Sequence, residues 1–79
     1  MLRAYILIET VVGTSTKVVA SLKAMKGVKS ADFVTGPYDV IVEVEVIGEG
    51  TLGDLLEDQV RRVPGISKTV TCLVVTGRR

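Results

Sequence analysis

The chain has 79 residues and a mass of 8.4 kDa, which is the size of one small domain. It is 47% hydrophobic and 24% charged, a composition typical of a packed globular protein and not of a disordered segment. Ten Lys and Arg against nine Asp and Glu give a formal net charge of +1, which argues against nucleic acid as the main partner. There is no apolar run of roughly 18 residues and no signal-peptide pattern, so we expect no membrane association and a cytoplasmic location.

The missing residue types exclude several kinds of chemistry. His is absent, which removes the commonest general base and the commonest metal ligand. The single Cys, Cys72, can form neither an internal disulfide nor a zinc site. We therefore expect no metal, no cofactor and no enzymatic activity. A domain this small buries only about 60% of its unfolded surface, so oligomerisation is the expected source of further stability. The absence of Asn, with Gln59 as the single Gln, is typical of a thermophilic source.

The first third of the chain predicts a strand, a helix and a second strand. Residues 5–12 form an apolar, β-branched run that ends at Gly13 and is typical of a buried strand. Residues 14–16 offer N-caps to a helix, and Gly27 would end it in the left-handed conformation. Residues 28–35 predict the second strand. The apolar positions of the helix recur at helical spacing: Val18, Val19, Leu22 and Met25.

A turn and the clearest strand follow. Gly36, Pro37, Tyr38 and Asp39 are typical turn residues, because Pro fixes its own φ and Gly permits a positive one. Residues 40–46 alternate strictly, so the strands on either side of the turn form an antiparallel hairpin. One face of the third strand is entirely valine, and the other carries Ile41, Glu43 and Glu45.

The last third predicts a helix and a strand. Residues 51–54 resemble a capping box, and Pro64 with Gly65 ends the helix. Residues 68–75 form the last strand, and residues 77–79 are expected to fray. The apolar stripe of the helix comprises Leu52, Leu55, Leu56, Val60 and Val63. Its outer side offers the i,i+4 pairs Glu57 with Arg61 and Asp58 with Arg62.

The order strand, helix, strand, strand, helix, strand predicts a ferredoxin-like α+β sandwich. Two right-handed βαβ units in succession give a four-stranded antiparallel sheet with both helices on one face. The first and last strands are apolar on both sides, so the uncovered face would expose a large apolar surface. We expect two copies to pack these faces together as a two-fold dimer. A monomer with an apolar sheet face is the alternative.

The turn at residues 36–39 is the strongest candidate site, although ordinary turn chemistry alone explains its composition. The whole chain also resembles the effector-binding domain of the Lrp/AsnC transcriptional regulator family, also called the RAM domain. The resemblance rests on an ordered set of stretches: residues 4–8, residues 18–28, the Thr-Gly-Pro-Tyr-Asp turn at residues 35–39, residues 64–66 and residues 69–71.

The resemblance implies a function in sensing amino acids and regulating the transcription of amino-acid metabolism. It implies a homo-oligomer in which dimers assemble further, often into an octameric ring, with an amino-acid effector bound in clefts between subunits. Asp39 would hold the ammonium group of the effector, the backbone near Gly36 would hold its carboxylate, and Tyr38 would form a wall. Thr69 and Thr71 would supply further hydroxyl groups.

Typical members of the family carry an N-terminal helix-turn-helix, which this sequence lacks. We therefore expect residues 1–79 to be a stand-alone effector-binding domain that does not bind DNA directly and that assembles with itself or with full-length Lrp/AsnC regulators. Two alternatives remain open. One is an ACT-like regulatory subunit of an amino-acid enzyme. The other is a small dimeric ferredoxin-like enzyme, which would normally need a His or an acid–base pair.

Overall fold

The computed structural model describes residues 1–75, so the predicted fraying of residues 77–79 lies outside the described part of the chain. The elements follow one another in the predicted order. They are β1 (Leu2–Thr10), α1 (Ser15–Lys23), β2 (Val28–Phe33), β3 (Val40–Val46), α2 (Glu49–Asp58), the short 3-10 helix η1 (Val60–Arg62) and β4 (Ile66–Leu73).

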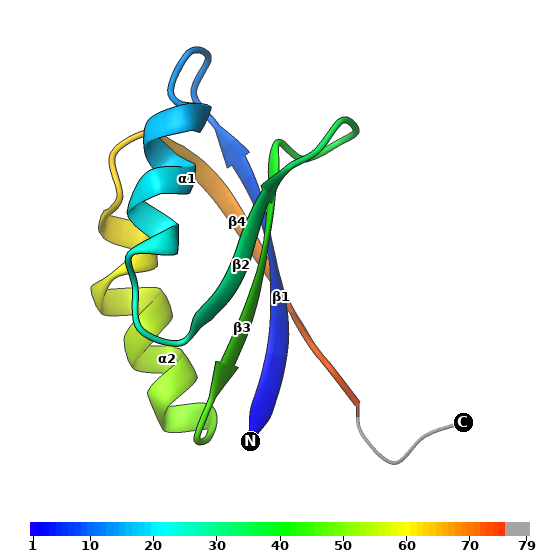
Figure 1. Ribbon diagram of the computed structural model, residues 1–79, viewed down its shortest axis with the longest axis vertical. Coiled ribbons are helices and arrows are strands. Elements are labelled where there is room, and N and C mark those ends of the chain that lie inside the picture. Colours follow the sequence, from blue (N-terminus) through cyan, green and yellow to red (C-terminus); the bar gives the residue numbers. More distant parts are fainter. Residues whose placement is uncertain (76–79) are drawn as a thin grey trace.

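The four strands form one antiparallel sheet in the order β2-β3-β1-β4. Both helices lie against the same face of this sheet, and the opposite face is uncovered (Figure 1). This arrangement confirms the predicted ferredoxin-like βαββαβ sandwich. The chain therefore has two kinds of sheet surface, one that packs within the subunit and one that does not.

The core lies between the sheet and the helices. Strict alternation along β3 buries its four valines, none of which is more than 5% exposed. Ile6 and Ile8 of β1 pair with Val42 and Val40, so the two central strands present a continuous apolar layer. The helices, together with Val63 just after η1, cover this layer with Val18, Val19, Leu22, Leu52, Leu55 and Val60.

The start of α2 differs from the prediction. The helix begins at Glu49, after Gly48 in an extended conformation, so residues 51–54 lie inside it and the predicted capping box is wrong. Glu49 places a negative charge in the first turn, where the helix dipole favours it.

The second predicted ion pair on the outer side of α2 is also absent. Glu57 and Arg61 form the predicted pair, with 2.9 Å between Oε2 and Nη1. Asp58 and Arg62, by contrast, form no ion pair within residues 1–75.

Two strands start earlier than predicted, β1 at Leu2 and β4 at Ile66, because each is paired there with a neighbouring strand. Leu2 pairs with Val46, and β1 is thereby extended toward its N-terminus. Gly27 and Gly65, at φ +97° and +100°, each lead into a strand in the left-handed conformation that was predicted for Gly27. A Cβ at position 65 would lie 2.6 Å from the Thr14 hydroxyl oxygen, so only glycine fits there.

Candidate functional site

The uncovered sheet face has an apolar centre. Leu7 pairs with Ile41 on one side and with Val70 on the other, and Tyr5 pairs with Cys72. Residues paired across antiparallel strands share a face, so these five side chains form one contiguous surface, which we call the open-face strip. Tyr5 is 37% exposed, and Leu7, Ile41 and Val70 are only partly buried. The strip therefore remains accessible to a partner.

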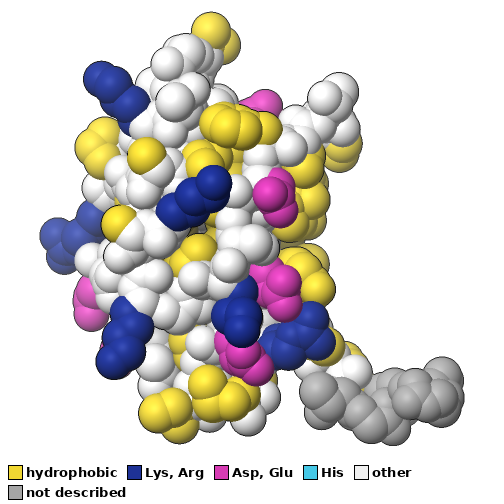
Figure 2. Space-filling model, in the orientation of Figure 1, with side chains coloured by type: hydrophobic (Ala, Val, Ile, Leu, Met, Phe, Trp, Pro, Cys, Tyr) yellow, Lys and Arg dark blue, Asp and Glu magenta, His cyan; other side chains and the backbone are white. Residues whose placement is uncertain are grey.

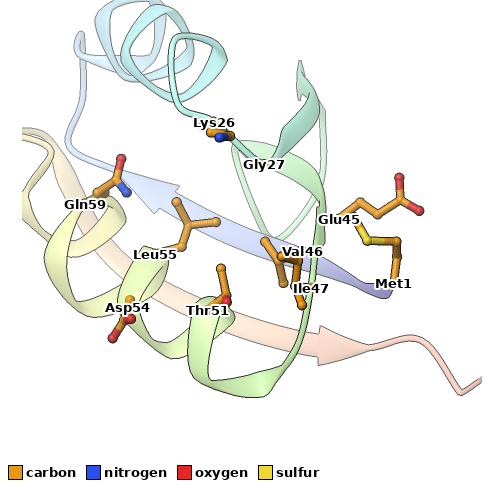
Figure 3. A pocket seen from close by; sticks show the side chains of 10 residues that line it. All are labelled: Met1, Lys26, Gly27, Glu45, Val46, Ile47, Thr51, Asp54, Leu55 and Gln59. Atoms are coloured by element: carbon orange, nitrogen blue, oxygen red, sulfur yellow. The ribbon is translucent and has the colours of Figure 1, made fainter.

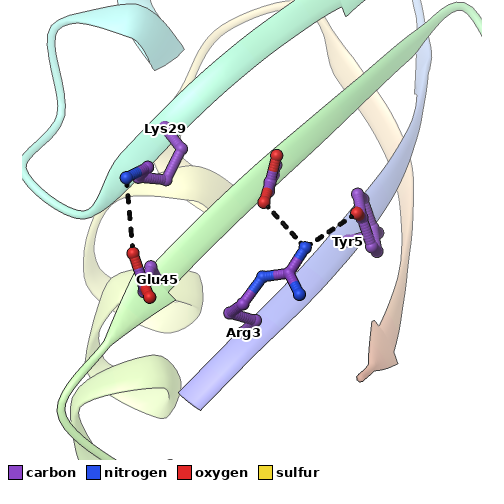
Figure 4. Close-up of polar contacts among 5 residues, drawn as sticks. Arg3, Tyr5, Lys29 and Glu45 are labelled. Carbon is purple, nitrogen blue, oxygen red and sulfur yellow. Dashed lines mark hydrogen bonds and ion pairs between the residues drawn. The ribbon is translucent and has the colours of Figure 1, made fainter. Parts of the chain in front are cut away.

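Ion pairs border this strip. The Arg3 guanidinium lies 3.0 Å from Glu43 Oε2 and also donates to the Tyr5 hydroxyl at 3.1 Å, and Lys29 lies 3.4 Å from Glu45 (Figure 4). The hydrogen bond to Glu43 is the main cause that raises the pKa of Arg3 above its ordinary value. Both glutamates of β3 thus face a cation. Elsewhere in the view of Figure 2, basic side chains are scattered and interleaved with acidic ones instead of forming one basic surface.

The turn at residues 36–39 is held firmly at its C-terminal end. Gly36 has a φ of +154°, a conformation that L-residues rarely adopt. Asp39 donates its backbone N–H to the Ile8 carbonyl at 2.9 Å, and its own carbonyl accepts from Val34 N–H at 3.0 Å. Tyr38 and Asp39 are half-buried, whereas Gly36 is exposed. The structure thus brings Gly36, Tyr38 and Asp39 together on one loop, beside the end of β1.

The Asp39 carboxylate is held by residues that the sequence analysis did not identify. Its Oδ2 accepts hydrogen bonds from the Thr10 backbone N–H at 2.8 Å and from the Thr10 hydroxyl at 3.2 Å. The Thr10 hydroxyl in turn lies 2.8 Å from the Ser15 hydroxyl. Both side-chain hydrogen bonds within residues 1–75 use Oδ2, so Oδ1 keeps its capacity to accept from a ligand. No local sequence motif signals a contact across 29 residues.

The two threonines of β4 lie in a different place. Thr69 pairs with Ile8 and Thr71 with Ile6, so both face the helix side of the sheet. They share one face, as predicted, but β1 separates them from β3, and two strand spacings amount to about 10 Å. A single chain therefore does not gather all five predicted site residues around one small ligand.

Two pockets formed by the described residues lie away from the turn. The larger pocket, of about 390 Å³, lies at the opposite end of β3 and has the apolar side chains of Val46 and Leu55 in its lining (Figure 3). None of the five predicted residues lines it. A second pocket, of about 210 Å³, is lined by Arg61, Ile66, Ser67, Lys68 and Thr69. Thr69 is therefore the one predicted residue found in these two pockets.

Two kinds of feature are absent from residues 1–75. No helix there is long and apolar enough to cross a membrane. The same residues contain no group of three or more His, Cys, Asp or Glu side chains that could hold a metal ion.

Two solved structures and one segment of a larger enzyme are each about a third identical to this chain. A crystal structure of a protein named FFRP-DM1 is 36% identical, with a TM-score of 0.91 over 95% of this chain and 100% of that one. A hypothetical protein of Pyrococcus horikoshii is also 36% identical, with a TM-score of 0.90 over 95% of this chain and 90% of that one. A homocitrate synthase of Sulfurisphaera tokodaii is 36% identical over 61 residues, which are 77% of this chain but only 13% of the enzyme.

A more distant solved structure shares the fold alone. It is a transcriptional regulator of Neisseria meningitidis in complex with L-Met, 16% identical, with a TM-score of 0.85 over 99% of this chain and 52% of that one.

The family model described as the Lrp/AsnC ligand binding domain matches residues 3–77, nearly the whole chain. The chain therefore belongs to the Lrp/AsnC ligand-binding domain family, as its sequence motifs predicted.

Proposed function

We propose that this chain is a sensor module that binds a free amino acid and regulates transcription through its state of assembly. The observation that carries the proposal is the match of residues 3–77 to a family defined by ligand binding. The solved regulator of the same fold in complex with L-Met supports an amino acid as the ligand class. Residues 1–79 would act as one effector-binding domain.

The geometry of the turn suits a zwitterion. Asp39 has one carboxylate oxygen held by Thr10 and one that can accept a charge-assisted hydrogen bond from an ammonium group. Exposed backbone near Gly36 can bind the ligand carboxylate through its N–H groups. Tyr38 contributes a ring and a hydroxyl beside them. Because Thr69 and Thr71 lie across β1, we propose that they reach the ligand from a second copy of the chain.

The uncovered sheet face supplies the means of assembly. We propose that two copies pack their open-face strips together and that these dimers associate further into a ring or with full-length Lrp/AsnC regulators. A ligand bound between subunits stabilises only the assembly that forms its site, so binding and assembly are thermodynamically coupled. The amino acid would then change the size or composition of the oligomer.

Calorimetric titration with each of the common amino acids, with light scattering in parallel, tests this function. For the tightest ligand, Asp39→Ala is expected to reduce affinity about ten- to a hundredfold, because one charge-assisted hydrogen bond contributes about 1.5–3 kcal/mol. Asp58→Ala is the matched control, since it removes the same charge from an exposed position outside the turn. Equal affinities of wild type and Asp39→Ala would show that Asp39 is a turn residue only.

A second candidate function is favoured by one observation, the matching segment within a homocitrate synthase. A domain of this kind could regulate an enzyme from a separate chain, in the manner of an ACT domain. The purified chain, with and without its amino acid, would then change the kcat or KM of the purified enzyme. The chain would leave the DNA affinity of a full-length Lrp/AsnC regulator unchanged. The first function predicts instead that the chain changes this DNA affinity and leaves the kinetics of the enzyme unchanged.

A further inference from the structure

A chain of three side chains joins the candidate ligand site to the first turn of α1. A carboxylate only accepts hydrogen bonds, so the Thr10 hydroxyl donates its single proton to Asp39 Oδ2, at 3.2 Å. That proton is then not available to Ser15, and the 2.8 Å contact between the two hydroxyls has Ser15 as the donor. The hydrogen bonds therefore run in one direction, from Ser15 through Thr10 to Asp39, an arrangement in which each bond polarises the next.

The backbone places Thr10 for this contact. The β1–β4 ladder shifts register between Glu9 and Thr10, so Thr10 sits at a bulge where the strand leaves regular pairing. A bulge re-aims the side chain beside it, and here the Thr10 hydroxyl lies between Asp39 and Ser15. Three segments, the end of β1, the turn before β3 and the start of α1, thus meet at one hydroxyl.

The helix end at this junction has no cap of its own. Thr14 occupies the N-cap position but makes no side-chain cap hydrogen bond, and the first turn contains no acidic residue. The Thr14 hydroxyl donates to the Val11 carbonyl at 2.6 Å instead. A helix N-terminus is stabilised by nearby negative charge. The Asp39 carboxylate, connected through the Thr10 hydroxyl to Ser15, is the charge that the structure joins to this helix end.

We infer that Thr10 and Ser15 are positioning residues that couple the charge state of Asp39 to the stability of the first turn of α1. An ammonium group bound to Asp39 would neutralise the carboxylate, weaken the hydroxyl chain and loosen the start of the helix. The ligand part of this inference rests on the proposed function, because it takes Asp39 as the amino-acid anchor. The coupling between Asp39 and α1 exists without ligand and can be measured without one.

Amide hydrogen exchange of the ligand-free protein tests the coupling. The Val18 amide donates the first hydrogen bond of α1, to the Thr14 carbonyl at 3.0 Å, and therefore reports the first turn. Asp39→Asn removes the charge that strengthens the hydrogen bond from Thr10, and Thr10→Val removes the hydroxyl itself. Each should raise the Val18 exchange rate about two- to tenfold, the range expected when one hydrogen bond is weakened or lost. Thr10→Ser should restore the wild-type rate, because the hydroxyl remains. Thr35→Val is the matched control, the same chemical change at an exposed residue outside the hydroxyl chain.

The combined variant decides whether the residues act as one unit. Thr10→Val with Asp39→Asn should raise the Val18 exchange rate no further than Thr10→Val alone, since the loss of the Thr10 hydroxyl already disconnects Asp39 from Ser15. The Val42 amide in the core should keep its wild-type rate, which separates local opening from global unfolding. A wild-type Val18 rate in Asp39→Asn, or multiplicative effects in the double variant, would overturn the inference.

Titration of 15N-labelled protein with L-methionine separates this inference from the proposed function. In the wild type, amides at Asp39 and at Val18 should both shift. In Thr10→Val, the Asp39 amide should still shift and the Val18 amide should not. If L-methionine shifts no amide of the wild type, the proposed function fails for that ligand, and the exchange rates alone decide the coupling.

Discussion

The two faces of the sheet are built from the same strands and yet differ in composition and burial. On the helix side, the β3 residues are all valine and almost completely buried. On the open side, β3 carries Ile41, Glu43 and Glu45, all only partly buried. The helix side contains enough apolar surface to form the core of a subunit. The open side presents an apolar strip bordered by charges, which is the composition of a protein interface.

Polar groups show the same contrast. The described residues include no buried polar or charged side chain, so the core gains nothing from ion pairs. The open face holds Arg3 with Glu43 and Lys29 with Glu45, and the side chains of both pairs are partly exposed. Exposed pairs contribute little to the stability of a monomer. These ion pairs would matter more if a second copy of the chain covered this face, because each charge would then be buried together with its counter-ion and not alone.

The largest expected effect is a difference in the free energy of unfolding between substitutions at two adjacent residues of β1. Ile6 faces the helices and is fully buried, whereas Leu7 faces outward and is partly buried. Ile6→Ala should lower the free energy of unfolding by about 2–5 kcal/mol through lost burial and a cavity. Leu7→Ala should lower it by only about 1 kcal/mol in the monomer. Urea denaturation at low protein concentration measures both, and equal losses would contradict the difference between the faces.

A smaller effect is expected on self-association from one charge on the open face. Ile41 lies opposite Leu7 and Asp32, so Ile41→Glu places a carboxylate in the apolar strip beside an existing one. The dimer dissociation constant should rise at least tenfold, which corresponds to about 1.4 kcal/mol. Sedimentation velocity over a range of concentrations measures this constant.

Ile47→Glu is the matched control for that experiment. It makes the same chemical change at a side chain that is 83% exposed and lies beyond the end of β3. This variant should dimerise like the wild type. A wild type that is monomeric at micromolar concentration would contradict the assignment of the open face as a dimer interface.

The sequence predicted the parts of the fold that depend on local pattern. Alternation along β3 needs no tertiary information, and its bounds at Val40 and Val46 agree with the prediction. The start of α2 was missed because Gly48 and Glu49 form its N-terminus without a side-chain cap, which leaves little local signal. The early starts of β1 and β4 depend on pairing with β3 and β1, respectively, which is a long-range property.

The candidate site was less predictable for the same reason. The turn at residues 36–39 is one continuous segment, and its motif identifies it. Thr10 and Ser15 reach Asp39 only after β1, α1 and the turn have been brought together by folding. The position of Thr69 and Thr71 follows from the strand order, which places β1 between them and β3. Residues whose roles depend on tertiary contacts cannot be identified from local motifs in a single sequence.

The smallest expected effect compares two arginine–glutamate pairs of nearly equal length. Arg3 and Glu43 lie 3.0 Å apart on the open face, and Arg61 and Glu57 lie 2.9 Å apart on the helix side. Arg61→Gln should lower stability by about 0.3–0.5 kcal/mol at every protein concentration, as for an exposed i,i+4 pair. Arg3→Gln should have a similarly small effect on the monomer, but it should also weaken the dimer, because Glu43 would then be buried without its cation. Thermal unfolding of both variants across a hundredfold range of concentration distinguishes the two. A concentration-independent loss for Arg3→Gln would mean that the open face stays in water and that this pair, like its counterpart on α2, is only a surface contact.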